Sequence, residues 1–440
     1  MAVIHPDIEI LDHRVMRNAN YDRTRHAAAR TEDYIFNQLI PYIGNKRKLL
    51  DLIWRALRHT GAGPGSTFLD MFAGSGVVSR LAKTLGYRVI ANDWEPYTKA
   101  INTCYIACNL KPAFVSLGGY QAAVDCLNNL PPRVDWVTEH LCPCDDVNYH
   151  IAVDRMFYMR KNGVRIDAIR HQISQWRESG TIGEDEEACL LAPLLYQACY
   201  TSNTSGVFKG FHNGWGGQTQ TALYRIAGDL RLSPAVFLDN NLDNEVICGD
   251  AQRVAEELQD IVDVAYLDPP YNQHPYGSNY HVLNSVTLWD KPALSKAITP
   301  GTKSAIRMDW RTARRSAYNY KGEAENAYRD LIQALKVRFI MTSYSTDGII
   351  PLEDVLRANV EQGSVHIETC EYKRYRVSTQ RFSTKPVNVE FIVVVDTQEK
   401  SRSSVDELMA GILATEQEAL QSHPESQSSV ENQLMLLGEI

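Results

Sequence analysis

The strand, glycine turn and helix expected over residues 67–85 constrain the fold of this chain more than any other feature. An apolar run opens this segment, Gly74 and Gly76 follow it, and helical residues complete it. A second short strand over 88–92 ends in Asp93. This order is typical of the start of a doubly wound sheet, in which glycines let the backbone approach a ligand. The sequence therefore predicts an α/β fold.

The glycine turn also indicates which kind of ligand it binds. Its pattern is Gly74-x-Gly76, which differs from the three-glycine dinucleotide fingerprint, and the lysine of a phosphate loop is missing. A carboxylate at the position of Asp93 can bind the paired hydroxyls of a ribose. These features favour S-adenosylmethionine over NAD or ATP. A tight structural turn without a ligand is the alternative interpretation.

A second motif, Asp268-Pro269-Pro270-Tyr271, ends the apolar run over 262–267. The exocyclic amine of a nucleobase is a poor nucleophile because its lone pair is delocalised into the ring. Asp268 and the carbonyl of Pro269 would accept hydrogen bonds from this amine, and Tyr271 would stack on a base flipped out of a duplex. A strand followed by a Pro-Pro turn and an ordinary surface tyrosine is the alternative.

Tyr42, Gly44 and Lys46 form a third motif, which precedes the first strand. The chain thus runs Tyr-x-Gly-x-Lys, Asp-x-Phe-x-Gly-x-Gly, a long insertion, and Asp-Pro-Pro-Tyr. This order resembles the alpha class of DNA adenine-N6 methyltransferases, the Dam-like family, over residues 34–110 and 245–395. For the third motif alone, a solvated helix start is the alternative.

The resemblance implies a Rossmann-like S-adenosylmethionine-dependent methyltransferase sheet with an inserted, largely helical target-recognition region. It further implies direct methyl transfer to the exocyclic amine of a flipped adenine. The implied cofactor-binding residues are Tyr42, Gly44, Lys46, Asp70, Phe72, Gly74, Gly76, Asp93 and Asp250. The implied catalytic residues are Asp268, Pro269, Pro270 and Tyr271.

Five segments are expected along the chain. They are an N-terminal arm over 1–33, the first catalytic part over 34–110, the target-recognition insertion over 111–240, the second catalytic part over 241–396, and an acidic tail over 397–440. Within the insertion, Ile166, Ile169, Ile173 and Trp176 repeat at helical spacing, which predicts a core-facing helix. The tail is expected to lack fixed structure for the most part. An apolar helical face near Ile412 would dock on the body or on a partner.

Charge is unusual for a chain expected to bind double-stranded DNA, because its net value is −8. Residues 396–440 contain 2 basic and 9 acidic residues, so nearly all of this charge lies in the tail. Candidate base contacts lie in the glycine-rich loop over 203–217, and candidate phosphate contacts lie in later basic clusters. These candidates are Lys209, His212, Asn213, Arg311, Arg314, Arg315, Lys373, Arg374 and Arg376. A compact structural loop and solvated arginines are the alternatives.

Cysteine and hydropathy patterns argue against a disulfide-stabilised protein, a zinc ribbon and a membrane-spanning protein. The number of cysteines, 9, is odd, which argues against a disulfide framework, and no metal site is predicted. Cys104, Cys108, Cys142 and Cys144 have spacings unlike those of a zinc ribbon. No run of eighteen apolar residues exists, so no membrane span is expected, and we expect a cytoplasmic protein encoded by a bacterium or a phage.

The expected role is modification of one DNA sequence, either for restriction-modification or for phage defence and self-marking. A restriction nuclease or the subunits of a defence system would then be partners. Adenine in RNA and cytosine-N4 in DNA are alternative substrates. A non-catalytic DNA-binding protein with a methyltransferase fold is the alternative of another class. A cytosine-C5 nucleophile at Pro143-Cys144 is disfavoured because Asp145 follows it and no apolar strand precedes it.

Overall fold

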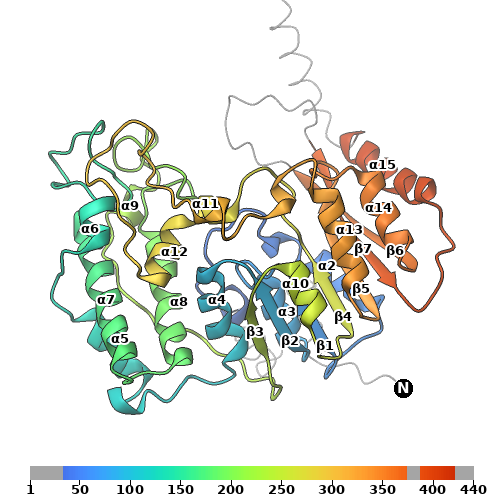
Figure 1. Ribbon diagram of the computed structural model, residues 1–440, viewed down its shortest axis with the longest axis horizontal. Helices are drawn as coiled ribbons and strands as arrows, with labels where there is room; N and C mark the ends of the chain where they lie inside the picture. Colours follow the sequence, from blue (N-terminus) through green and yellow to red (C-terminus); the bar gives the residue numbers. More distant parts are fainter. Residues whose placement is uncertain (1–32, 374–386, 422–440) are drawn as a thin grey trace, which may run out of the picture. The chain divides into compact units, whose positions relative to one another are not determined.

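The computed structural model describes residues 33–373 and 387–421, so the predicted N-terminal arm lies almost entirely outside the described residues. The chain divides into two compact units. The first unit comprises residues 1–47, 73–250 and 274–315, and the second comprises residues 48–72, 251–273 and 316–440. The strands belong to one mixed seven-stranded sheet in the order β3-β2-β1-β4-β5-β7-β6 (Figure 1). The predicted α/β class is confirmed.

Five strands belong to the second unit: β1 (Thr67–Asp70), β4 (Val264–Leu267), β5 (Phe339–Ser345), β6 (Ser364–Lys373) and β7 (Val387–Asp396). Strand β4 is parallel to β1 and to β5, whereas β7 is antiparallel to both β5 and β6. Parallel strands in register end at the same edge of a sheet. The residues that follow β1, β4 and β5 therefore lie along one edge within this unit.

Helices cover both faces of this part of the sheet. They are α2 (Leu50–Arg58), α10 (Ala251–Glu257), α13 (Ala324–Ala334), α14 (Leu352–Val360) and α15 (Val405–Gln421), with a 3-10 turn at Ala317–Asn319. All seven residues of β5 are buried. Because successive strand residues point to opposite faces, this continuous burial requires cover on both sides. Helices α2, α14 and α15 pack against β6 and β7.

The first unit contains β2 (Arg88–Asp93) and β3 (Glu245–Cys248), which are parallel, with Asp93 opposite Cys248. Its helices are α3 (Val77–Thr84), α4 (Pro96–Asn102), α5 (Tyr120–Asn128), α6 (Trp136–Leu141), α7 (Arg160–Glu178), α8 (Glu184–Tyr200), α9 (Leu223–Ile226), α11 (Tyr276–Asn279) and α12 (His281–Leu288). Shorter turns are the π-helix Thr103–Ala107 and the 3-10 turns Lys46–Lys48, Val115–Leu117 and Asp309–Arg311.

The insertion between β2 and β3 is largely helical, as the sequence predicted. Its longest helix, α7, buries Ile166, Ile169 and Ile173, whereas Trp176 stays partly exposed. Helix α8 begins where the Glu186 carboxylate accepts a hydrogen bond from the backbone N–H of Gly183, at 2.9 Å. No helix of the described residues is long and apolar enough to cross a membrane.

Residues 405–421 of the predicted tail form α15, which contains the apolar helical face noted in the sequence. This helix buries Ile412 and Ala419 and packs against α14, β6 and β7. The apolar face noted in the sequence thus docks on the body of the chain, because its burial outweighs the effect of the surrounding charge. Residues 422–440 lie outside the described residues.

Replacing Ile412 by alanine is expected to lower the free energy of unfolding by about 2–5 kcal/mol, because it leaves a cavity beneath α15. Ile412 is 1% exposed, whereas its neighbour Leu413 is 37% exposed and makes a matched control. Leu413→Ala is expected to cost less than about 1 kcal/mol. Urea denaturation followed by circular dichroism measures both changes, and equal losses would show that α15 does not pack as described.

Candidate active site

The predicted glycine turn follows β1 and adopts backbone angles that favour glycine. Gly74 has φ 51° and Gly76 has φ 79°, both in the left-handed region. A Cβ on Gly74 would lie 2.7 Å from Cε1 of Tyr42, so the tyrosine ring lies directly against the backbone. The Gly74 N–H donates to Oδ2 of Asp93 at 2.9 Å. The turn and the end of β2 are therefore fixed to each other.

Asp93 also organises the chain beyond its own strand. Its Oδ1 accepts the backbone N–H of Glu95 at 3.0 Å, and burial raises the pKa of its carboxyl. The buried Asn92 exchanges two hydrogen bonds with the backbone of Gly249, at 3.1 and 3.2 Å. These bonds hold the end of β3 beside the end of β2. Asp250 follows at this same edge of the first unit.

Tyr42 lies in a stack of tyrosines that the sequence analysis missed. Its ring centroid is 5.0 Å from those of both Tyr276 and Tyr280, with interplanar angles of 20° and 10°. Tyr276 donates to the carbonyl of Ile43 at 3.0 Å, and Tyr280 accepts the Ile43 N–H at 2.7 Å. Burial raises the pKa of Tyr42. The spacing of Tyr276 and Tyr280 by four residues was the available signal.

The remaining residues of the Tyr-x-Gly-x-Lys motif form a tight turn. Gly44 has φ 74°, and the N–H of Asn45 donates to the carbonyl of Tyr42 at 3.2 Å. Lys46 is 3% exposed, whereas Arg47 and Lys48 are exposed. The alternative interpretation, a solvated helix start, is therefore wrong for Lys46, because its side chain is buried.

Arg314 was predicted to contact phosphates, and the structure gives it a different environment. Its side chain is 12% exposed and lies 2.7 Å from Asp309 and 3.7 Å from Glu95. Burial raises the pKa of Glu95 to about 7, although Arg314 and a hydrogen bond from Asn284 oppose this rise. Arg314 thus belongs to a partly buried ion-pair network and is a poor candidate for a phosphate contact.

In the second unit, the Asp-Pro-Pro-Tyr motif begins directly after β4. Asp268 and Tyr271 are half-buried, whereas Pro269 is buried. The Tyr271 ring meets Tyr344 of β5 edge to face, at 6.0 Å and 75°. The Tyr344 hydroxyl accepts the N–H of Ile350 at 3.0 Å, and burial raises its pKa to about 12. Tyr344 therefore fixes Tyr271 from one side while that ring stays partly accessible.

The end of β1 contributes two more predicted residues at this edge of the second unit. Asp70 is 1% exposed and lies opposite Tyr266 of β4, two residues before Asp268. Phe72 meets Tyr318 edge to face at 5.3 Å. Carboxylates and aromatic rings thus follow neighbouring parallel strands, and this arrangement can position a planar ring and polarise an amine.

The glycine-rich loop over 203–217 is compactly folded. Asn203 is buried and its amide nitrogen donates to the carbonyls of Met156, His212 and Gly214, at 3.0, 3.1 and 3.3 Å. This bonding confirms the structural interpretation of the loop. It does not exclude base contacts, because Asn213 at its tip is exposed.

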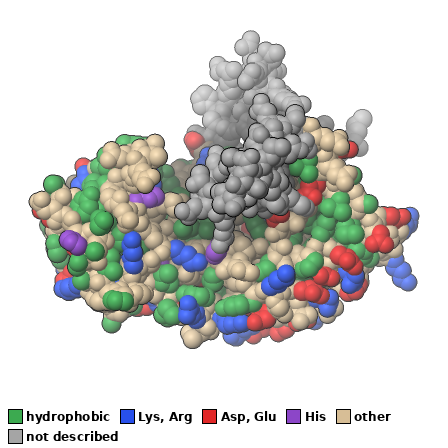
Figure 2. Space-filling model, turned by 90° about the horizontal axis from the view of Figure 1, so that it is seen from above, with side chains coloured by type: hydrophobic (Ala, Val, Ile, Leu, Met, Phe, Trp, Pro, Cys, Tyr) green, Lys and Arg blue, Asp and Glu red, His purple; other side chains and the backbone are tan. Residues whose placement is uncertain are grey.

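The other predicted DNA contacts have varied environments. Lys209 Nζ lies 3.4 Å from Nδ1 of His274, and the ring of His212 packs against Gly217. Arg311 and Arg315 are exposed. On the face in Figure 2, Lys and Arg side chains are interspersed with Asp and Glu. Arg374, Arg376 and the Lys373 side chain lie outside the described residues.

The family model and the relatives that match this chain are all methyltransferases or methylases. A model described as D12 class N6 adenine-specific DNA methyltransferase matches residues 42–342. The chain is 31% identical over 353 residues to the Type II methyltransferase M.NlaIII of Neisseria lactamica, which covers 80% of this chain and 96% of that protein. The modification methylase StsI of Streptococcus sanguinis is 31% identical over 340 residues, covering 76% of this chain and 48% of StsI. The Type II methyltransferase M.CviAII of Paramecium bursaria Chlorella virus 1 is 27% identical over 358 residues, covering 81% of this chain and 99% of M.CviAII.

Proposed function

Because this chain belongs to the D12 class N6 adenine-specific DNA methyltransferase family, we propose that it transfers a methyl group from S-adenosylmethionine to the N6 amine of adenine in double-stranded DNA. The observation that carries this proposal is the Asp-Pro-Pro-Tyr motif at the carboxyl end of β4. There Asp268 and Tyr271 are both half-buried, and Tyr344 supports the tyrosine ring.

The proposed step is a direct displacement that the motif promotes by polarising the amine. Asp268 Oδ and the carbonyl of Pro269 accept hydrogen bonds from the two N6 protons, which draws the nitrogen lone pair out of the ring. That lone pair would form the new N–C bond as the S–C bond of the donor breaks with its electrons kept on sulfur, and N6 would then pass one proton along its hydrogen bond to the Asp268 carboxylate. Tyr271 stacks on the flipped base and holds it in line.

The glycine turn fits S-adenosylmethionine as the methyl donor. Gly74 and Gly76 both adopt left-handed φ angles, and Tyr42 and Asn102 pack so closely against them that neither position has room for a Cβ. We assign the ribose to Asp93, the adenine to Asp250 and the methionine end to Tyr42, Gly44 and Lys46. Asp70, Phe72, Gly74 and Gly76 form the main binding loop of this assignment. Bound there, the donor supplies a methyl group made electrophilic by its sulfonium. The chain's own residues bind and orient it.

Sequence reading is assigned to residues 111–240, with Lys209, His212 and Asn213 as candidate base contacts. Arg311 and Arg315, both exposed, remain candidates for phosphate contacts. The relatives include Type II methyltransferases and a modification methylase. We therefore propose that methylation protects DNA at a sequence that a restriction nuclease cuts.

Replacing Tyr271 by alanine is expected to lower kcat/KM for DNA about 10- to 100-fold, because base–aromatic stacking contributes about 1–3 kcal/mol. S-adenosylmethionine affinity should change little. Tyr271→Phe keeps the ring and serves as the control, with activity within about threefold of the unaltered protein. Steady-state methylation of a short duplex measures the effect. A phenylalanine variant as impaired as the alanine variant would rule out stacking as the role.

The proposed function is tested by expressing the chain and its Asp268→Ala variant in a methylation-deficient bacterial host, followed by single-molecule sequencing of modified bases. N6-methyladenine at one recurring sequence, present only with the unaltered chain, is the expected result. Methylcytosine instead of methyladenine would contradict the assigned base. An unmodified genome, despite protein that binds S-adenosylmethionine, would contradict DNA as the substrate and direct the assay to RNA.

A further inference from the structure

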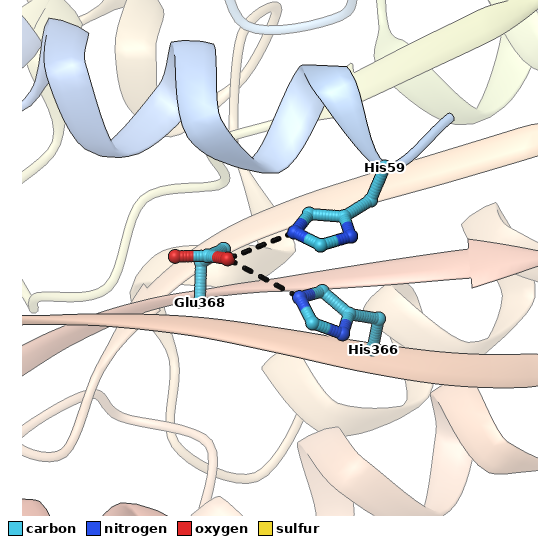
Figure 3. Close-up of side chains that lie close together, drawn as sticks. All are labelled: His59, His366 and Glu368. Atoms are coloured by element: carbon cyan, nitrogen blue, oxygen red, sulfur yellow. Dashed lines mark hydrogen bonds and ion pairs between the residues drawn. The ribbon is translucent and has the colours of Figure 1, made fainter. Parts of the chain in front are cut away.

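Two histidines and one glutamate of the second unit converge on one another (Figure 3). His59 follows the last residue of α2, and His366 and Glu368 lie on β6. The carboxylate oxygen Oε1 of Glu368 lies 2.9 Å from Nε2 of His59 and 3.2 Å from Nε2 of His366. The donor atoms of all three residues lie within 4.8 Å of one another. The proposed methyl transfer uses none of them.

The fold explains this convergence. Residues 366 and 368 are two apart on a strand and therefore point to the same face. Helix α2 packs on β6, which brings the end of that helix over this face. The two imidazole rings stack with centroids 3.6 Å apart. The His59 and His366 side chains are 42% and 45% exposed, so solvent reaches both rings.

Arg55 fixes the orientation of the carboxylate. Its guanidinium forms an ion pair with the other oxygen, Oε2 of Glu368, and is itself 3.3 Å from Asp51 one turn earlier on α2. Oε1 is thus held toward the two imidazoles. Hydrogen-bonded carboxylates of this kind are usual among metal ligands.

We propose that His59 Nε2, His366 Nε2 and Glu368 Oε1 bind a divalent transition metal of the zinc class. Two imidazoles and one carboxylate are a common donor set for Zn²⁺, whereas Mg²⁺ and Ca²⁺ prefer oxygen donors. Bonds of about 2.0–2.1 Å in a tetrahedral site place donor atoms roughly 3.3 Å apart. The nitrogen–oxygen distances of 2.9 and 3.2 Å are close to this spacing. The metal would replace the protons now shared between these atoms.

Such a metal would link the end of α2 to an outer strand of the sheet. Strand β6 stands last in the strand order, so one of its edges is not paired within the sheet. Binding to the folded state alone stabilises that state by mass action. The site therefore acts as a clamp on β6, and it is independent of the proposed methyl transfer.

Titration of the full-length, chelator-treated protein with ZnCl2 by calorimetry tests the site, with melting temperature as a second readout. One Zn²⁺ per chain and a rise in melting temperature are expected, with no response to MgCl2. His59→Gln and His366→Gln should each weaken binding more than about tenfold and abolish the rise. His150→Gln, at an exposed histidine outside the cluster, should behave like the unaltered chain.

Exposed thiols are a competing source of zinc binding, so the titration is repeated after alkylation of Cys126, Cys144 and Cys248, which are exposed. Circular dichroism of the metal-free variants confirms that they fold. Zinc binding that survives in both histidine variants, or that disappears on alkylation alone, would overturn the proposal.

Discussion

Asp268→Ala is expected to reduce methyl transfer by at least about a thousandfold, within the range that a single positioned acid, base or electrostatic group contributes to catalysis. The dissociation constant of S-adenosylmethionine should stay within about threefold, because the glycine turn and Asp93 are unchanged. This split between chemistry and binding distinguishes a catalytic residue from one that only supports the fold.

The size of this effect follows from the position of the carboxylate. Asp268 is the first residue after a fully buried strand, and its motif neighbour Pro269 is buried as well. Alanine at this position leaves only the Pro269 carbonyl to accept a hydrogen bond from the amine. Asp268→Asn retains an acceptor oxygen without the charge, so its loss should be intermediate, about 10- to 100-fold.

Single-turnover transfer of a labelled methyl group to a duplex that contains the target sequence measures the rate. Calorimetry measures cofactor affinity with the same preparations. Turnover of the alanine variant within tenfold of the unaltered enzyme would refute the catalytic role of Asp268. Equal loss of cofactor binding would mean that this residue holds the donor.

Gly76→Ala is expected to lower S-adenosylmethionine affinity more than about tenfold. Its φ of 79° costs about 1–2 kcal/mol for any residue with a Cβ. The added methyl would also overlap Oδ1 of the buried Asn102, whose amide donates to the carbonyl of Gly74 at 3.3 Å. Displacing Asn102 therefore disturbs the turn that we assign to the donor.

Gly65→Ala is the matched control for this experiment. Gly65 has φ 89°, and a Cβ there would meet nothing within 4 Å, so it carries the backbone strain without the overlap. We expect a small loss of stability and unchanged cofactor affinity. Equilibrium binding and thermal melting of both variants separate the two effects. A Gly76→Ala protein with unaltered affinity would remove the turn from the cofactor site.

Much of the catalytic sheet could be predicted from local pattern. The strand at 67–70, the helix from residue 77 and the strand ending at Asp93 lie within one residue of their expected bounds, because apolar runs, glycines and helical periodicity are all local signals. The Asp-Pro-Pro-Tyr motif likewise follows β4 as expected. The roles of these residues remain proposals.

The features that sequence analysis missed depend on residues distant in the chain. The partners of Arg314 are Glu95 and Asp309, and a count of basic residues cannot show that such an arginine is already neutralised. The stack of Tyr276 and Tyr280 on Tyr42 joins segments more than two hundred residues apart. The histidine–glutamate cluster requires α2 to pack on β6.

The path of the chain between its two units has a consequence for how its gene can diversify. The chain crosses from one unit to the other after residues 47, 72, 250, 273 and 315, so no single cut separates the units. Residues 111–240, in contrast, begin and end inside one uninterrupted stretch of the first unit, 73–250. Recombination that exchanges residues 111–240 between related genes leaves every crossing intact. If these residues read the DNA sequence, as we propose, such an exchange changes the site that the enzyme methylates and leaves the Asp-Pro-Pro-Tyr motif unaltered.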